Sequence, residues 1–199
     1  SSTVSTSPTT FGRIFHGLPP FAPATDAVRD ALRDLGAKGG PLDAKDDLAK
    51  GPVLLITAPS LSANNPNNPT HTAGTTFFGQ FVDHDLTFDA TTVAFGDNIS
   101  PAALLQGRSP TLDLDSLYGF GPLDPVSADF YEADRTRLKV GKTTRFGGDQ
   151  ARVGFDLPRT EGATPDEPRK ANIPDFRNDE NLVVAQTHAA MIRFHNRVV

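Results

Sequence analysis

Residues 77–88 constrain the fold of this 199-residue chain more than any other stretch, because FFGQFVDHDLTF sets three ionisable side chains in a row between apolar ones. Read as a helix, it puts Gln80 and His84 on one face and turns Asp83 and Asp85 about 100° away from His84 in opposite directions. Burying carboxylates and an imidazole costs free energy unless a metal, a cofactor or hydrogen bonds compensate them. The stretch therefore predicts a functional site carried on a rigid helix.

The composition excludes several kinds of site and partner. The net charge is −5 and no basic run stands out, which argues against nucleic acid or an anionic membrane as the main partner. No apolar run approaches the roughly 20 residues of a membrane span. With no cysteine, the chain has no disulfide, thiolate metal site or cysteine nucleophile. Its 17 glycines and 17 prolines predict many turns and irregular segments.

Local patterns predict a mainly α chain with long irregular loops and little β structure. Thr25 is expected to N-cap a helix that ends at Gly36, and residues 53–56 are expected to form a short strand or an extended segment. Residues 179–199 predict the clearest helix, which stops at Val199 without glycine, cap or proline, so we expect the chain to be part of a longer protein. The apolar positions of this last helix are Leu182, Val183, Ala190, Met191, Phe194 and Val198.

The stretch 80–85 resembles the distal helix of the animal-type haem peroxidases, which belong to the peroxidase–cyclooxygenase superfamily. The resemblance implies their helical fold and a bound haem b. It also implies that His84 takes a proton from hydrogen peroxide and returns it to the leaving oxygen, while Gln80 lines the distal cavity. Asp83 would form an ester with the haem, and Asp85 would point away and bind calcium.

A second stretch, residues 109–119, carries hydroxyl and carboxylate side chains at alternate positions. An extended or looped backbone turns such residues to one side, and oxygen ligands of this kind suit calcium. On these residues alone, a solvated acidic turn is an equal alternative. The stretch resembles the calcium loop of the same family, in which the ligands precede a Tyr-Gly pair. Besides Asp85, the implied ligands are the side chains of Ser109, Asp113 and Asp115 and the carbonyl of Thr111.

The third stretch, residues 173–181, reads locally as a polar loop with acidic residues at the start of a helix. It resembles the family segment in which the catalytic arginine is followed three residues later by a glutamate. Arg177 would then stabilise the negative charge that develops as the O–O bond of hydrogen peroxide breaks. Glu180 would form a second ester with the haem. Asn181 stands where myeloperoxidase has a methionine bonded to the haem through sulfur, so no such bond is expected.

The proximal histidine, which in this family ligates the haem iron from the opposite side, has no counterpart among the five histidines. His188 and His195 match other family positions and are expected to be structural hydrogen-bonding residues. The iron ligand is therefore expected on a second chain or on the remainder of the polypeptide. We expect residues 1–24 to be an extended arm and residues 25–199 to be the distal half of one catalytic domain.

The function implied is a secreted peroxidase that uses hydrogen peroxide to oxidise halide, thiocyanate or small aromatic donors. Three alternatives stay open. The first is a haem-dependent fatty-acid dioxygenase of the same superfamily, and the second is a calcium-stabilised adhesion module without turnover. The third is a non-haem iron site made of His84, a carboxylate and His188.

Overall fold

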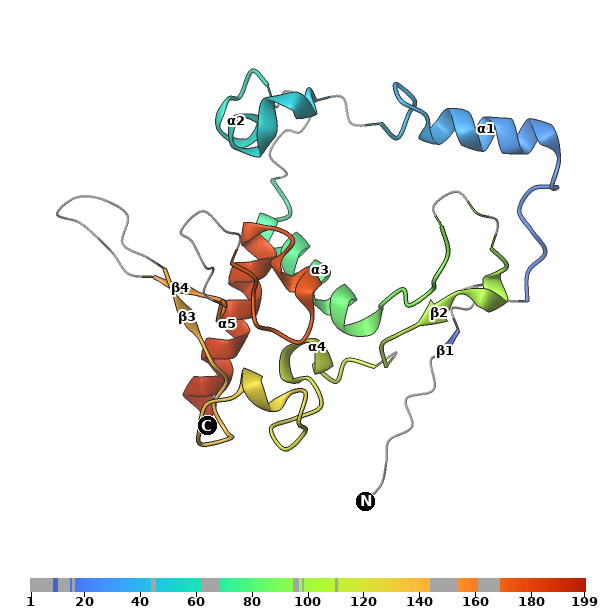
Figure 1. The fold of residues 1–199 in the computed structure, drawn as a ribbon. Helices are drawn as coiled ribbons and strands as arrows, with labels where there is room; N and C mark the ends of the chain where they lie inside the picture. Colours follow the sequence, from blue (N-terminus) through green and yellow to red (C-terminus); the bar gives the residue numbers. More distant parts are fainter. Residues whose placement is uncertain are drawn as a thin grey trace. The chain divides into compact units, whose positions relative to one another are not determined.

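The structure of the chain is a computed structural model. It describes residues 9–10, 15, 17–43, 46–61, 69–94, 97, 99–109, 111–143, 154–160 and 169–199. Within these residues the chain is mainly helical, as predicted, with two short two-stranded sheets (Figure 1).

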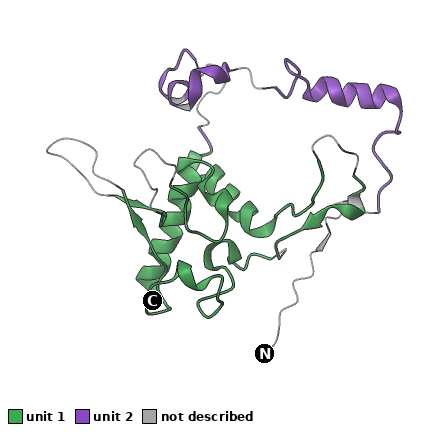
Figure 2. Ribbon diagram, in the orientation of Figure 1, with its two compact units in different colours: residues 1–12, 71–199 green, residues 13–70 purple. Residues whose placement is uncertain are grey.

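The chain divides into two compact units (Figure 2). Unit 1 comprises residues 1–12 and 71–199, and unit 2 comprises residues 13–70. This division differs from the one expected from the sequence, which placed an arm over residues 1–24 and one domain over residues 25–199.

Unit 2 contains helix α1 (Asp26–Gly36), which begins and ends where the sequence predicts. The hydroxyl of Thr25 accepts a hydrogen bond from the Val28 N–H at 3.4 Å, as an N-cap residue does. Asp26 in the first turn and Arg33 in the last complement the helix dipole. No residue of α1 is buried, so its apolar stripe has no cover in this structure.

Helix α2 (Gly51–Thr57) corrects the expectation of a strand at residues 53–56. A proline stands in its first turn, where the missing N–H of proline costs no hydrogen bond. The Thr57 hydroxyl donates to the Val53 carbonyl at 2.8 Å, and the Ala58 N–H donates to the Leu54 carbonyl at 2.9 Å. The short apolar run does not distinguish helix from strand by itself, and the proline position decides for the helix.

Helices α3 (Ala73–Leu86) and α5 (Leu182–Val198) pack against each other in unit 1 (Figure 1). The hydroxyl of Thr72 caps α3, and the side chain of Asn181 caps α5 by accepting from two backbone N–H groups. The core around these helices consists of Phe81, Leu117, Tyr131, Leu138, Leu157, Ile173, Val184, Ala185, Ala189 and Ile192.

The buried face of α5 differs from the apolar positions read from the sequence. Five of those six positions are exposed, among them Leu182 by 77%, Phe194 by 67% and Val198 by 69%. The helix instead buries a face of aliphatic residues together with one histidine, and a histidine that finds a partner costs little to bury. The buried residues are Val184, Ala185, His188, Ala189 and Ile192.

Short strands and turns connect the helices of unit 1. β1 (Thr9–Thr10) pairs antiparallel with β2 (Leu105–Gln106), and β3 (Gly141–Lys142) pairs antiparallel with β4 (Phe155–Asp156). Helix α4 (Asp115–Tyr118) is a single turn. Turns of 3₁₀ helix lie at Leu48–Lys50 in unit 2 and at Pro101–Ala103, Ala128–Phe130 and Phe176–Asp179 in unit 1. Among the described residues, no helix combines the length and the apolar character that crossing a membrane requires.

Candidate functional site

The last turns of α3 present the four predicted site residues to different surroundings. His84 and Asp85 are buried, with 5% and 0% of their surfaces exposed. Gln80 is half-buried and Asp83 is exposed. Successive residues of a helix point about 100° apart, so one short segment reaches both the core and the surface.

Asp85 ties α3 to the loop that precedes α4. Its carboxylate accepts hydrogen bonds from the Leu114 N–H at 2.8 Å and from the Ser116 N–H at 3.1 Å. Leu114 has the left-handed backbone conformation, with φ 61° and ψ 31°, which turns these N–H groups toward the carboxylate. The residue next to His84 therefore fixes the loop by charge-assisted hydrogen bonds.

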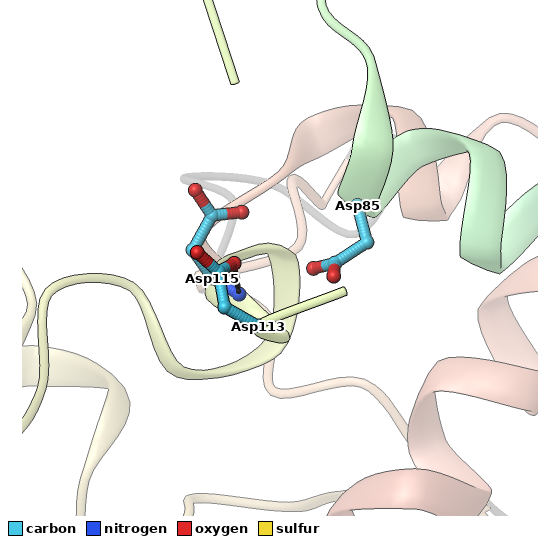
Figure 3. Close-up of side chains that lie close together, drawn as sticks. All are labelled: Asp85, Asp113 and Asp115. Atoms are coloured by element: carbon cyan, nitrogen blue, oxygen red, sulfur yellow. Dashed lines mark hydrogen bonds between the residues drawn. The ribbon is translucent and has the colours of Figure 1, made fainter. Parts of the chain in front are cut away.

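Three carboxylates gather beside this loop, and they are three of the predicted calcium ligands (Figure 3). One oxygen from each of Asp85, Asp113 and Asp115 lies within 4.8 Å of the other two. Burial raises the pKa of Asp115, and the nearby carboxylates raise it further, against the opposing effect of Arg108. A cation that takes oxygen ligands would relieve this gathering of like charge.

The two remaining predicted ligands lie in the same loop. The hydroxyls of Ser109 and Thr111 are hydrogen-bonded to each other, and the Thr111 hydroxyl donates to the Asp113 carboxylate at 3.4 Å. The Asp115 N–H donates to the other carboxylate oxygen of Asp113 at 3.3 Å. The atoms that these five residues would offer to a metal are all oxygens, so the residues present fit a hard divalent cation such as calcium.

Asp175 joins two arginines next to the carboxylate cluster. Its buried carboxylate accepts from Arg108 at 2.6 Å and from Arg177 at 2.7 Å, and Arg108 also pairs with Asp115 at 3.1 Å. Burial raises the pKa of Asp175, but the hydrogen bonds from Arg177 and Arg108 outweigh it, and the pKa is lowered overall. This ion-pair network connects the loop that carries Asp113 and Asp115 to the segment that carries Glu180.

Arg177 uses its guanidinium to hold the C-terminal end of α3. It donates to the backbone carbonyls of His84 at 2.7 Å and of Thr87 at 2.6 Å, and lies 4.8 Å from the centroid of the Phe88 ring. Helix carbonyls at this end have no partner within the helix, so the contacts stabilise it. These hydrogen bonds go to backbone and carboxylate oxygens, and the predicted charge-stabilising role of Arg177 stays a prediction.

Gln80, His84 and Glu180 converge although Glu180 lies a hundred residues after Gln80. The Gln80 amide donates to the Glu180 carboxylate at 3.3 Å, and the same carboxylate oxygen lies 3.8 Å from His84 Nε2. Asn181, the N-cap of α5, donates to the side-chain carbonyl of Gln80 at 3.2 Å. The geometry thus brings together three side chains that the sequence placed in one pocket.

A buried chain of side chains lies behind His84. Its Nδ1 is 2.9 Å from the Asn178 side-chain oxygen, and the Asn178 side-chain nitrogen is 2.9 Å from His188 Nδ1. Burial lowers the pKa of His188 to about 4, against the opposing charges of Asp175 and Asp179, so its imidazole is neutral at pH 7.

The expectation that His188 and His195 make structural hydrogen bonds agrees with their contacts. His195 Nδ1 lies 3.1 Å from the Tyr118 hydroxyl, and its Nε2 lies 2.8 Å from the Thr136 carbonyl oxygen. His188 is bound to Asn178 inside the core. Neither imidazole contributes to the carboxylate cluster.

The sequence analysis missed the roles of Asn178, Asp175 and Arg108. Asp175 and Asn178 stand inside the third recognised stretch but were read only as polar loop residues. The many polar side chains in this segment, which leads into α5, could have predicted a buried hydrogen-bond network, because buried polar residues need partners.

Comparison with known proteins adds no relative. Neither a protein-family model, nor a curated protein, nor a solved structure matches this chain.

Proposed function

We propose that this chain supplies the distal side of the haem pocket of a peroxidase that uses hydrogen peroxide to oxidise small anionic or aromatic donors. The observation that carries the proposal is the convergence of Gln80 and His84 on one carboxylate oxygen of Glu180, at 3.3 and 3.8 Å. A buried imidazole beside an amide and a carboxylate is an arrangement suited to proton transfer.

We propose that Asp83 and Glu180 hold the haem. Both carboxylates are exposed, as a carboxylate that forms an ester with a cofactor must be, and His84, next to Asp83 in the sequence, is buried. When bound, haem would supply the redox-active iron at which hydrogen peroxide is reduced. His84 would accept a proton from the peroxide and return it to the leaving oxygen, and Gln80 would orient water or a halide.

Calcium is proposed as the second cofactor, held by the carboxylates of Asp85, Asp113 and Asp115, the Ser109 hydroxyl and the Thr111 carbonyl. The cluster and its all-oxygen donors support this part of the proposal. Because Asp85 adjoins His84, calcium would fix the helix that carries the base. The proximal iron ligand is proposed to come from a second chain or from further sequence of the same polypeptide.

The test is an absorption spectrum of the assembled protein purified from its natural source, followed by acid-acetone extraction. We expect a Soret band that stays with the protein, because Asp83 and Glu180 are proposed to be ester-linked. If the Soret band is lost to the solvent, the proposal of a bound haem stands and the proposal of ester links is wrong. The absence of a Soret band from the complete assembly would overturn the peroxidase proposal.

Replacing His84 by alanine tests the role of the proposed base in the same assembly. We expect turnover with hydrogen peroxide to fall by about 10²–10⁴-fold, the usual contribution of a general acid–base group, with the Soret band retained. His71→Ala is the matched control for turnover, because it removes an exposed histidine outside the proposed site. Unchanged turnover in His84→Ala would contradict the assignment.

The structure bears on one of the alternatives. A non-haem iron site using His84 and His188 would need both imidazoles at one metal, but the amide of Asn178 lies between their Nδ1 atoms. An adhesion module would bind calcium without a Soret band, and a fatty-acid dioxygenase would oxidise a fatty acid in place of small donors. The same spectrum and a donor assay therefore separate these alternatives from the proposal.

A further inference from the structure

The amide of Asn178 lies between two histidines in the core of unit 1. His84 has 5% of its surface exposed, and Asn178 and His188 have none. The two hydrogen bonds of the amide are both 2.9 Å, one to each Nδ1. Because all three groups are buried, water is not available to replace either bond.

We propose that Asn178 is a positioning residue that fixes the proton of His84 on Nδ1 and so keeps Nε2 of His84 free to receive a proton. A side-chain carbonyl oxygen can only accept a hydrogen bond, so the Nδ1 that faces it must carry the proton. The amide nitrogen can only donate, so Nδ1 of His188 must present its lone pair. When both imidazoles are neutral, they therefore hold opposite tautomers, with the proton on Nδ1 in His84 and on Nε2 in His188.

The backbone around Asn178 holds the amide in this orientation. Asn178 lies in the 3₁₀ turn Phe176–Asp179, and its N–H donates to the Asp175 carbonyl at 3.1 Å. The Asp175 carboxylate caps the turn by accepting from the Arg177 N–H at 3.0 Å. On the other side, the Phe81 and His188 rings pack in a T-shaped arrangement, with ring centroids 5.8 Å apart.

Neither Nε2 atom makes a hydrogen bond that opposes this assignment. Nε2 of His188 is buried without a hydrogen-bond partner among the described residues, so the tautomer of His188 is set at its Nδ1. Nε2 of His84 lies 3.8 Å from Glu180, beyond hydrogen-bond distance, and that carboxylate oxygen already accepts from Gln80. Nε2 of His84 is therefore the proton-accepting atom on the side of Gln80 and Glu180.

The test is a two-dimensional proton–nitrogen spectrum of the full chain with nitrogen-15-labelled histidine, recorded at neutral pH. Each ring nitrogen reports whether it carries a proton. We expect a proton on Nδ1 of His84 and on Nε2 of His188. A proton on Nε2 of His84, or the same tautomer in both histidines, would overturn the inference without any variant being made.

Two substitutions of Asn178 extend the test. Asn178→Asp replaces the amide donor by a second acceptor, so the His188 proton should move to Nδ1 while His84 keeps its own on Nδ1. Asn178→Leu removes both hydrogen bonds and should abolish the fixed Nδ1 proton of His84. Asn172→Leu is the matched control, because it removes an exposed hydrogen bond to Asp129 and should leave both tautomers unchanged.

The inference rests on the proposed function only in giving Nε2 its use as the proton acceptor. The nitrogen spectrum needs neither haem nor turnover, and the Soret band does not depend on the tautomer. A missing Soret band with opposite tautomers would overturn the peroxidase and leave the role of Asn178 standing. A retained Soret band with the His84 proton on Nε2 would support the peroxidase and overturn the role of Asn178. Tautomers that do not respond to Asn178→Asp would also overturn the role of Asn178.

Discussion

At the scale of single residues, Asp175 links two arginines of the candidate site. Its carboxylate is fully buried and binds Arg108 and Arg177, whose side chains are also mostly buried. Arg108 continues to the carboxylate cluster, and Arg177 continues to the end of α3. Removal of the one carboxylate would leave two buried cations without their shared partner.

We expect Asp175→Asn to lower the free energy of unfolding by about 3–5 kcal/mol, the usual cost of removing one partner of a buried ion pair. Urea unfolding at pH 7 measures the change. Asp129→Asn is the control, because its ion pair with Lys139 lies at the surface and is expected to contribute no measurable stability. Equal effects of the two substitutions would contradict the role given to Asp175.

The pH dependence of stability gives an independent check on Asp175. Its pKa is lowered in the folded chain, so the unfolded chain binds more protons between the folded and unfolded values, and stability rises with pH there. The stabilisation should be complete above about pH 4, the unfolded value for aspartate, and should be lost as pH falls through the lowered folded value. The difference between the wild type and Asp175→Asn should therefore shrink on acidification.

Two groups of the site residues named from the sequence follow local spacing patterns, and the roles of the others rest on the resemblance. The alternation around Asp113 and the four-residue spacing of Gln80 and His84 are local patterns, and the structure brings their members together. The roles of Asn178 and Asp175 depend on partners far away in the sequence, so no local pattern predicts their hydrogen bonds. The contacts of Arg177 with backbone carbonyls are likewise invisible before folding.

At the scale of elements, caps were predictable and buried faces were not. Thr25 and Gly36 mark the ends of α1 because capping is local chemistry. Thr72 caps α3, and Thr75 and Thr76, which follow within four residues, are also residue types that can cap a helix. The buried face of α5 depends on which neighbours it meets, and the sequence of one helix does not contain them.

Two glycines should respond oppositely to alanine because their surroundings differ. Gly79 lies inside α3 with open space at its Cβ position, so Gly79→Ala should stabilise the chain by about 0.5–1 kcal/mol by reducing the entropy lost on folding. At Gly141 in β3, an added Cβ would clash with the Leu157 carbonyl oxygen, so Gly141→Ala should destabilise the chain by about 1–3 kcal/mol. Urea unfolding measures both, and a loss of stability in Gly79→Ala would contradict the open space.

At the scale of the whole molecule, the two units can be followed separately in one experiment. The chain has two tyrosines and no tryptophan, and Tyr118 and Tyr131 both lie in unit 1. Tyrosine fluorescence therefore reports the unfolding of unit 1 alone, whereas far-ultraviolet circular dichroism also detects α1 and α2 of unit 2. A ligand of unit 1 should shift the fluorescence transition and leave the unit 2 part of the dichroism unchanged.

Calcium is the ligand for which this separation decides most. Binding at the cluster of Asp85, Asp113 and Asp115 should stabilise unit 1 by about 2.7 kcal/mol at a calcium concentration one hundred times the dissociation constant. Asp113→Asn should abolish most of that gain, because it removes a ligand while sparing the hydrogen bonds of Asp85. Asp83→Asn carries the same change of charge on the exposed side of α3 and should keep the gain. Equal losses of this gain in the two variants would mean that the stabilisation depends on net charge and not on a calcium site. If saturating calcium causes no shift, calcium is not a cofactor of this chain.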